Sequence, residues 1–150
     1  MNRQSNLIGQ VSRVSILLLI MLWSYAFFIK LADFNLYRVQ MQDQPFPTVF
    51  NTILIYTLFP VEGLTALLLI LNKQIAGLWL SILLLLVFTW YILIITLHYF
   101  PDTPCSCGGF ISKMSWKNHL WFNLGLIAIN GFCLSVQLQK RKEVKRQSIP

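Results

Sequence analysis

The chain has 150 residues, of which 56% are hydrophobic and only 11% are charged, and its mean hydropathy is +0.62. These values exclude an ordinary soluble domain and predict an integral membrane protein. The net charge of +7 is concentrated in a basic run at residues 140–146 that no stacking aromatic accompanies, which favours anionic lipid and membrane topology over nucleic acid.

Four apolar stretches are each long enough to cross a hydrocarbon core of about 30 Å as a helix. They cover residues 14–31, 49–71, 75–97 and 120–138, and they lack the alternation of a membrane β-barrel. The first stretch is long and has no A-x-A-like exit, so we expect it to be retained rather than cleaved as a signal peptide. The sequence predicts an all-α, four-transmembrane-helix bundle at 14–138, between a cytoplasmic arm at 1–13 and a basic cytoplasmic tail at 139–150.

The segment between the first two stretches carries Phe34, Tyr37 and Met41 at near-helical spacing, before Pro45 and Pro47. This pattern favours a short amphipathic helix that lies on the outer membrane surface, covers the bundle and ends before the prolines. A solvated turn that connects two spans is an equally good interpretation of so short a segment.

The distribution of Lys and Arg predicts the orientation of the bundle. The arm, the turn at Lys73 and the tail hold eight of them, whereas Lys30, Arg38, Lys113 and Lys117 make four on the other side. Because cytoplasmic loops carry the excess of basic residues, we expect both termini in the cytoplasm. The loop between the third and fourth stretches then faces outward, which for a bacterial inner membrane means the periplasm.

This outward loop contains the motif Cys-Ser-Cys-Gly-Gly at residues 105–109. Two cysteines one residue apart need a local turn before their sulfurs can bond, and Pro101, Pro104 and the two glycines favour turns. A disulfide in so tight a ring is expected to be strained and easily reduced. Cys105 and Cys107 are therefore candidates for a redox-active pair, with a structural disulfide as the alternative.

The remaining histidines and cysteine are weaker candidates. His119 stands at the start of the fourth stretch. As a cation it would stabilise the thiolate of the cysteine pair, and the alternative is that its ring anchors the helix at the membrane interface. A soft-metal site that combines the pair with His98 and His119 is disfavoured because C-x-C spacing is unusual for zinc, so we expect no metal. Cys133 lies about 20 Å along the fourth stretch, where a small buried apolar side chain is expected.

With three cysteines in all, the chain has no second pair at its cytoplasmic side. A self-contained path for electrons across the bilayer by thiol exchange would need one. The interpretations that are left are exchange with periplasmic partners, oxidation by a membrane quinone, and a structural bridge. No other cofactor is evident.

Glu62 is the only acidic residue inside the four stretches, and an intramembrane carboxylate is a functional candidate because burying its charge is costly. Asn123, Asn130 and Gln137 recur every seven residues as a polar seam on the fourth stretch. Counting from the outer ends brings Glu62 and Asn130 to depths of about 20 and 15 Å, so that the two could meet. Interhelical hydrogen bonding is our preferred interpretation, and a proton or quinone site is the alternative.

Several short segments resemble the MauE/DoxX-like family of redox-associated four-helix membrane proteins, in its Bacteroidetes-type form. The resemblance covers roughly residues 14–138, and C-x-C-G-G is its most specific part. The segments are KLADF (30–34), RVQM (38–41), PVEGL (60–64), FTWYI (88–92), CSCGG (105–109) and SWKNHLWFN (115–123). It implies a redox-associated inner-membrane protein, similar to the member needed to mature the disulfide-rich small subunit of methylamine dehydrogenase. On that similarity, Cys105 and Cys107 are the thiol pair.

We therefore expect an inner-membrane protein that assists periplasmic thiol and disulfide chemistry, or matures a secreted or periplasmic partner, through Cys105 and Cys107. The partner would be a thioredoxin-like protein, a cysteine-containing client or a membrane complex. The alternative is a non-enzymatic subunit that anchors or accompanies a partner complex, with the disulfide as a staple, and the sequence does not decide whether the protein is an enzyme. A transporter is disfavoured by the lack of an inverted repeat.

Overall fold

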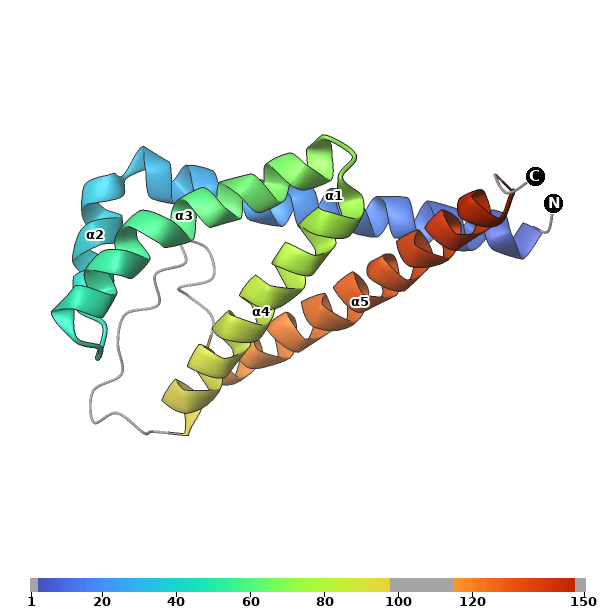
Figure 1. The fold of residues 1–150 in the computed structure, drawn as a ribbon. Helices are drawn as coiled ribbons and strands as arrows, with labels where there is room; N and C mark the ends of the chain where they lie inside the picture. The colour runs from blue at the N-terminus through green and yellow to red at the C-terminus, as the bar shows by residue number, and fades with distance from the viewer. Residues whose placement is uncertain (1–2, 98–114, 148–150) are drawn as a thin grey trace.

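The computed structural model describes residues 3–97 and 115–147, and its elements are helices throughout this part of the chain. In chain order they are α1 (Arg3–Ala32), α2 (Phe34–Gln42), α3 (Thr48–Ile70), α4 (Gln74–Thr96) and α5 (Trp116–Gln147) (Figure 1). All except α2 are long and apolar enough to span a membrane. The predicted all-α bundle with four spans is confirmed.

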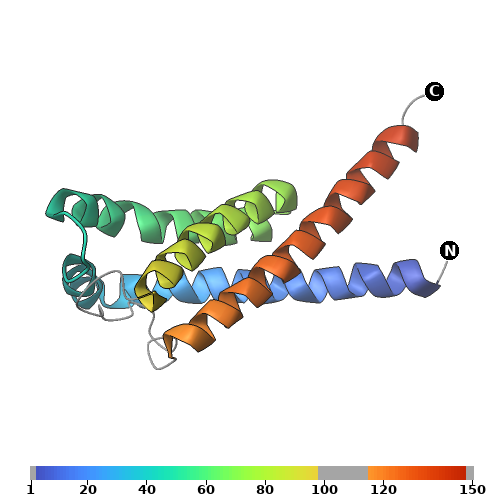
Figure 2. The ribbon, with the colours of Figure 1, turned by 90° about the horizontal axis from the view of Figure 1, so that it is seen from below.

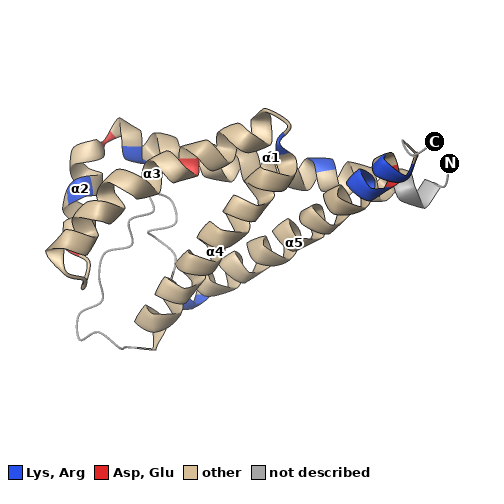
Figure 3. Ribbon diagram, viewed as in Figure 1, with Lys and Arg blue, Asp and Glu red and all other residues tan. Residues whose placement is uncertain are grey.

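The four long helices pack as two antiparallel pairs. α1 lies along α3 and α4 lies along α5, while α4 also packs on α3 and α5 crosses α1 (Figures 1 and 2). A tight turn joins α3 to α4, in which Asn72 adopts a positive φ of 58°, a conformation that asparagine tolerates better than most residues. Both termini lie at the same end of the bundle, which Figure 3 shows to be rich in Lys and Arg.

The core lies where the two pairs meet. Leu19 of α1, Leu69 of α3, Leu78 of α4 and Cys133 of α5 are at most 1% exposed. The outward faces of the helices are also apolar, with Val49, Trp90 and many other large side chains exposed. A helix that is hydrophobic all round suits a membrane, where lipid covers the outer face.

The short helix α2 confirms the helical interpretation of the segment after the first span, and the solvated turn is wrong. The carboxylate of Asp33 caps its first turn by accepting a hydrogen bond of 3.0 Å from the backbone N–H of Leu36. Tyr37 and Met41 are buried against Ile55 of α3, whereas Arg38 and Gln42 are exposed.

Two helices run further than their apolar stretches. α1 begins at Arg3 and α5 continues to Gln147, so most of the arm and of the basic tail extends the helices. Lys, Arg, Glu and Gln are good helix formers, and a helix therefore need not end where its lipid-facing part ends. Both extensions lie beyond the α3–α4 turn (Figure 1).

Candidate functional site: a buried ion pair and its polar neighbours

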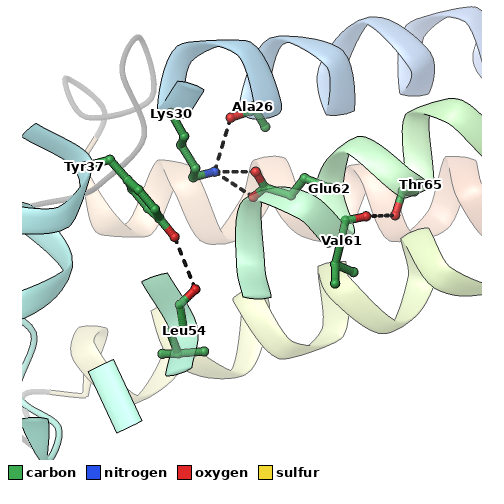
Figure 4. A network of polar contacts seen from close by, with 7 residues as sticks. All are labelled: Ala26, Lys30, Tyr37, Leu54, Val61, Glu62 and Thr65. Carbon is green, nitrogen blue, oxygen red and sulfur yellow. Dashed lines mark hydrogen bonds and ion pairs between the residues drawn. The ribbon is translucent and has the colours of Figure 1, made fainter. Parts of the chain in front are cut away.

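A buried ion pair joins Lys30 of α1 to Glu62 of α3 (Figure 4). The Lys30 Nζ lies 2.6 Å from each carboxylate oxygen, and the two residues are only 8% and 1% exposed. Lys30 also donates a longer hydrogen bond, of 3.4 Å, to the carbonyl of Ala26. An isolated buried charge would be costly in free energy, so each of the two charges stabilises the other.

Aromatic side chains from α2 and α3 enclose this ion pair. The Tyr37 ring lies 5.9 Å from the Lys30 Nζ, within the range of a cation–π contact, and its hydroxyl donates to the carbonyl of Leu54 at 3.3 Å. Phe59 of α3 packs edge-on against both Tyr37 and Phe34. The short helix α2 thus closes one side of the ion pair.

Gly63 allows α1 and α3 to approach closely beside the ion pair. A Cβ at this position would lie 2.8 Å from the ring of Phe27, which itself stacks on Phe59. The absence of a side chain at Gly63 therefore leaves room for the Phe27 ring where α1 packs on α3.

The ion pair joins the interior of α3 to the last turn of α1, where Lys30 stands two residues before the end of the helix. Glu62 is ten residues from Asn72 in the α3–α4 turn, which corresponds to about 15 Å along the helix. Lys30 is one of the four basic residues expected at the outer side, but it is buried and paired with Glu62. The ammonium group is thus part of the bundle interior.

The contact between Glu62 and Asn130 that depth counting allowed is not formed. The carboxylate binds Lys30, and Asn130 donates from its Nδ2 to the Ser81 hydroxyl of α4 at 2.5 Å. The reason is the helix arrangement, because α3 packs mainly against α1 and α4 rather than against α5.

Ser81 is the centre of a second buried network that ties three helices together. Its hydroxyl oxygen accepts from the Trp23 indole of α1 at 2.8 Å as well as from Asn130 of α5. Ser81 and Asn130 are both fully buried, and Trp23 is 2% exposed. Within the described residues the Asn130 Oδ1 has no hydrogen-bond partner. Interhelical bonding, the preferred interpretation of the polar seam, is found at this member of it.

A third polar group fixes the connection between α2 and α3. The Asn51 amide is 2% exposed and donates to the carbonyls of Gln42, Gln44 and Phe46 at 3.1–3.3 Å. The Gln44 side chain in turn accepts a hydrogen bond from the Tyr91 hydroxyl of α4. The connection is thereby held against the last turns of α4.

The remaining candidates from the sequence divide by position. Cys105 and Cys107, together with His98, lie outside the described residues, and their proposed roles stay predictions. His119 is half-buried in the first turn of α5 and stacks on Trp116 with ring centroids 6.5 Å apart, a contact suited to an interfacial anchor. Cys133 is free and fully buried, with its Sγ 3.8 Å from the carbonyl of Ser12. The buried apolar interpretation of Cys133 is confirmed.

The sequence singled out Glu62 and Asn130, but not the residues that bind them, Lys30 and Ser81. Glu62 and Asn130 attract notice as rare polar residues in apolar stretches, whereas Ser81 and Gln44 are common residue types with no periodic signal. Lys30 did carry a signal, since it and Glu62 are single opposite charges in neighbouring spans.

Comparison with known proteins gives one match. A family model described as "Methylamine utilisation protein MauE" matches residues 8–136, a range that begins in the first span and ends in the fourth. No curated protein and no solved structure matches the chain.

Proposed function

This chain belongs to the MauE family of multi-pass membrane proteins, and we propose that it assists the maturation of a partner protein by thiol–disulfide exchange at Cys105 and Cys107. The partner would be a thioredoxin-like or cysteine-containing protein on the periplasmic side of a bacterial inner membrane. The observation that carries the proposal is family membership over most of the chain, together with a C-x-C-G-G motif in the longest connection between spans.

The positions of the flanking helix ends support this proposal. α4 ends at Thr96 and α5 begins at Trp116, at the end of the bundle opposite the basic extension of α5 (Figure 3). Because basic residues gather on the cytoplasmic side of membrane proteins, the connection that contains both cysteines would start and finish at the periplasmic side.

The chemistry is a two-electron exchange. A thiolate of the reduced pair attacks a disulfide of the partner and forms a mixed disulfide. The second thiolate of the pair then attacks this mixed disulfide and releases the partner's thiolate. The pair ends as a disulfide and the partner as a dithiol, and the reverse sequence oxidises the partner. After the forward sequence a protein dithiol must reduce the pair again, whereas after the reverse sequence a protein disulfide or a membrane quinone must oxidise it.

The buried networks would act as a scaffold in this proposal. The Lys30–Glu62 pair joins α1 to α3, and the Trp23–Ser81–Asn130 network joins α1, α4 and α5, so together they hold the bundle that carries the connection. A direct quinone role for Glu62 gains no support from the geometry, since both carboxylate oxygens already bind Lys30.

Trapping of mixed disulfides tests the proposal. Cys105→Ser and Cys107→Ser, each expressed in cells and treated with acid and alkylating agent, should hold a partner through the cysteine that is left. We expect at least one of them to give a complex that a reducing agent dissolves. The matched control is Cys133→Ala, which retains both loop cysteines and removes a fully buried thiol.

The outcomes separate the two functions considered. A captured partner, with a reduction potential of the pair well above about −300 mV, supports exchange. A potential below about −300 mV with no partner captured by either variant overturns it, and favours an accessory subunit with a structural disulfide.

A further inference from the structure

Two adjoining cavities lie at the end of the bundle that carries the termini. The first, with a volume of about 810 Å³, lies between the start of α4 and the last turns of α5, and the second, of about 530 Å³, lies between α1 and the end of α3. Asn72 and Gln74 of the α3–α4 turn line both. Both are wide open to their surroundings rather than enclosed.

The first cavity is strongly basic. Lys73 lines it from the α3–α4 turn, and Lys140, Arg141 and Lys145 line it from one face of α5. Arg13 of α1 lines the second cavity. No acidic residue is among the lining residues, although Glu143 is nearby on α5. An anion placed here would meet cations from both sides of the cavity.

Apolar side chains continue from the basic cavity toward the lipid-facing surface. Val144 and Ile75 lie beside the cations in the first cavity, while Leu17 and Ile70 line the second. Val144, Leu17 and Ile70 are more than half exposed. A ligand that filled both cavities would need a negative headgroup and a hydrocarbon part.

The level of the cavities matches a membrane boundary. The α3–α4 turn marks the end of two apolar spans, and α5 turns from apolar to basic at about Lys140. Phospholipid phosphates lie at this boundary, with acyl chains directed into the bilayer. A free anion would gain nothing from the apolar part of the site.

We propose that these two cavities form a binding site for one anionic phospholipid, with its phosphate among Lys73, Lys140 and Arg141 and an acyl chain over Leu17 and Ile70. The site is at the opposite end of the bundle from the connection with Cys105 and Cys107, so it stands independently of thiol exchange. Basic pockets between membrane helices are known as headgroup sites for anionic lipids.

Native mass spectrometry of the purified full chain tests this site. The protein in detergent receives equal amounts of phosphatidylglycerol and phosphatidylcholine with matched acyl chains, and the lipid that stays bound is identified. We expect one phosphatidylglycerol to be retained in preference. Lys140→Gln/Arg141→Gln should weaken retention about 25-fold, at about fivefold for each cation lost near a lipid surface.

Arg38→Gln/Lys117→Gln provides the matched control, since it removes two exposed cations at the other end of the bundle. This control should retain the lipid, as should Lys140→Arg, which keeps the charge. Equal retention of phosphatidylcholine, or equal loss in the control variant, would overturn the proposal. So would displacement of the lipid by an equal concentration of glycerol phosphate, because the site would then bind a free phosphate and not a lipid.

Discussion

Lys30 and Glu62 are the two residues whose chemistry depends most on each other. Neither would be stable alone among apolar side chains, and the 2.6 Å contacts to both carboxylate oxygens form only when α1 and α3 are correctly aligned. A shift of one helix by a single turn would move the charges about 5 Å apart along the axis. The ion pair therefore specifies the alignment of α1 with α3.

Glu62→Gln should destabilise the protein by about 3 kcal/mol, because it leaves the Lys30 ammonium group buried without a counter-charge. Unfolding in mixed detergent, followed by circular dichroism, measures the change. Lys30→Met/Glu62→Leu removes both charges and should be more stable than the single variant. If Glu62→Gln unfolds at the same point as the unaltered protein, the ion pair has no such role.

Ser81→Ala should lower the stability by about 1 kcal/mol, since interhelical hydrogen bonds in membranes contribute about 0.6 kcal/mol each and this change removes two. The fluorescence of Trp23 should also shift as its indole loses its partner. Ser135→Ala is the matched control, because that hydroxyl is exposed and bonds only within α5. Equal effects of the two variants would show that the Ser81 network is not stabilising.

At the scale of helices, α3 and α4 approach closely near their shared turn. A Cβ on Gly77 would lie 2.8 Å from a methyl carbon of Leu69 and 3.1 Å from its backbone nitrogen. Gly125 of α5, in contrast, has no neighbouring atom within 4 Å of such a Cβ. The two glycines thus share a helical setting and differ in packing.

Gly77→Ala should be less stable than Gly125→Ala by at least about 1 kcal/mol. Both variants gain the same intrinsic helix preference, whereas only the first adds a clash, and overpacking of this kind costs about 1–3 kcal/mol. Thermal unfolding of the two variants side by side measures the difference. Equal unfolding temperatures would mean that α3 and α4 have room to separate at Gly77.

The element scale also shows what sequence alone could predict. Both ends of α3 and α4 were predictable to within one residue because apolar length is a direct requirement of the bilayer, whereas α1 and α5 run well beyond their apolar stretches. The helix α2 was one of two interpretations because Phe34, Tyr37 and Met41 share a helix face. Lys30 was open to prediction as the single charge opposite in sign to Glu62 in the neighbouring apolar stretch. The Ser81 partner of Asn130 was not predictable, because it depends on which helices are neighbours. The contact of Gln44 with Tyr91 spans 47 residues and has no local pattern.

At the scale of the whole molecule, the basic extensions and the short helix α2 lie at opposite ends of the bundle. The extensions of α1 and α5 form a basic end, and α2 with the connection that Asn51 holds forms the other (Figure 3). This asymmetry carries the proposed orientation, and with it the compartment in which Cys105 and Cys107 would react.

The orientation has a direct test in single-cysteine variants. In a chain whose three native cysteines are replaced, Arg38→Cys on α2 and Gln147→Cys at the end of α5 introduce thiols at exposed positions. A maleimide that does not cross membranes should label Arg38→Cys in intact bacterial cells, and Gln147→Cys only after the inner membrane is permeabilised. Basic extensions are retained in the cytoplasm during insertion, which is the reason for this expectation. The reverse pattern of labelling would place the C-x-C-G-G connection in the reducing cytosol, where disulfides rarely persist, and thiol exchange with a periplasmic partner would then be impossible.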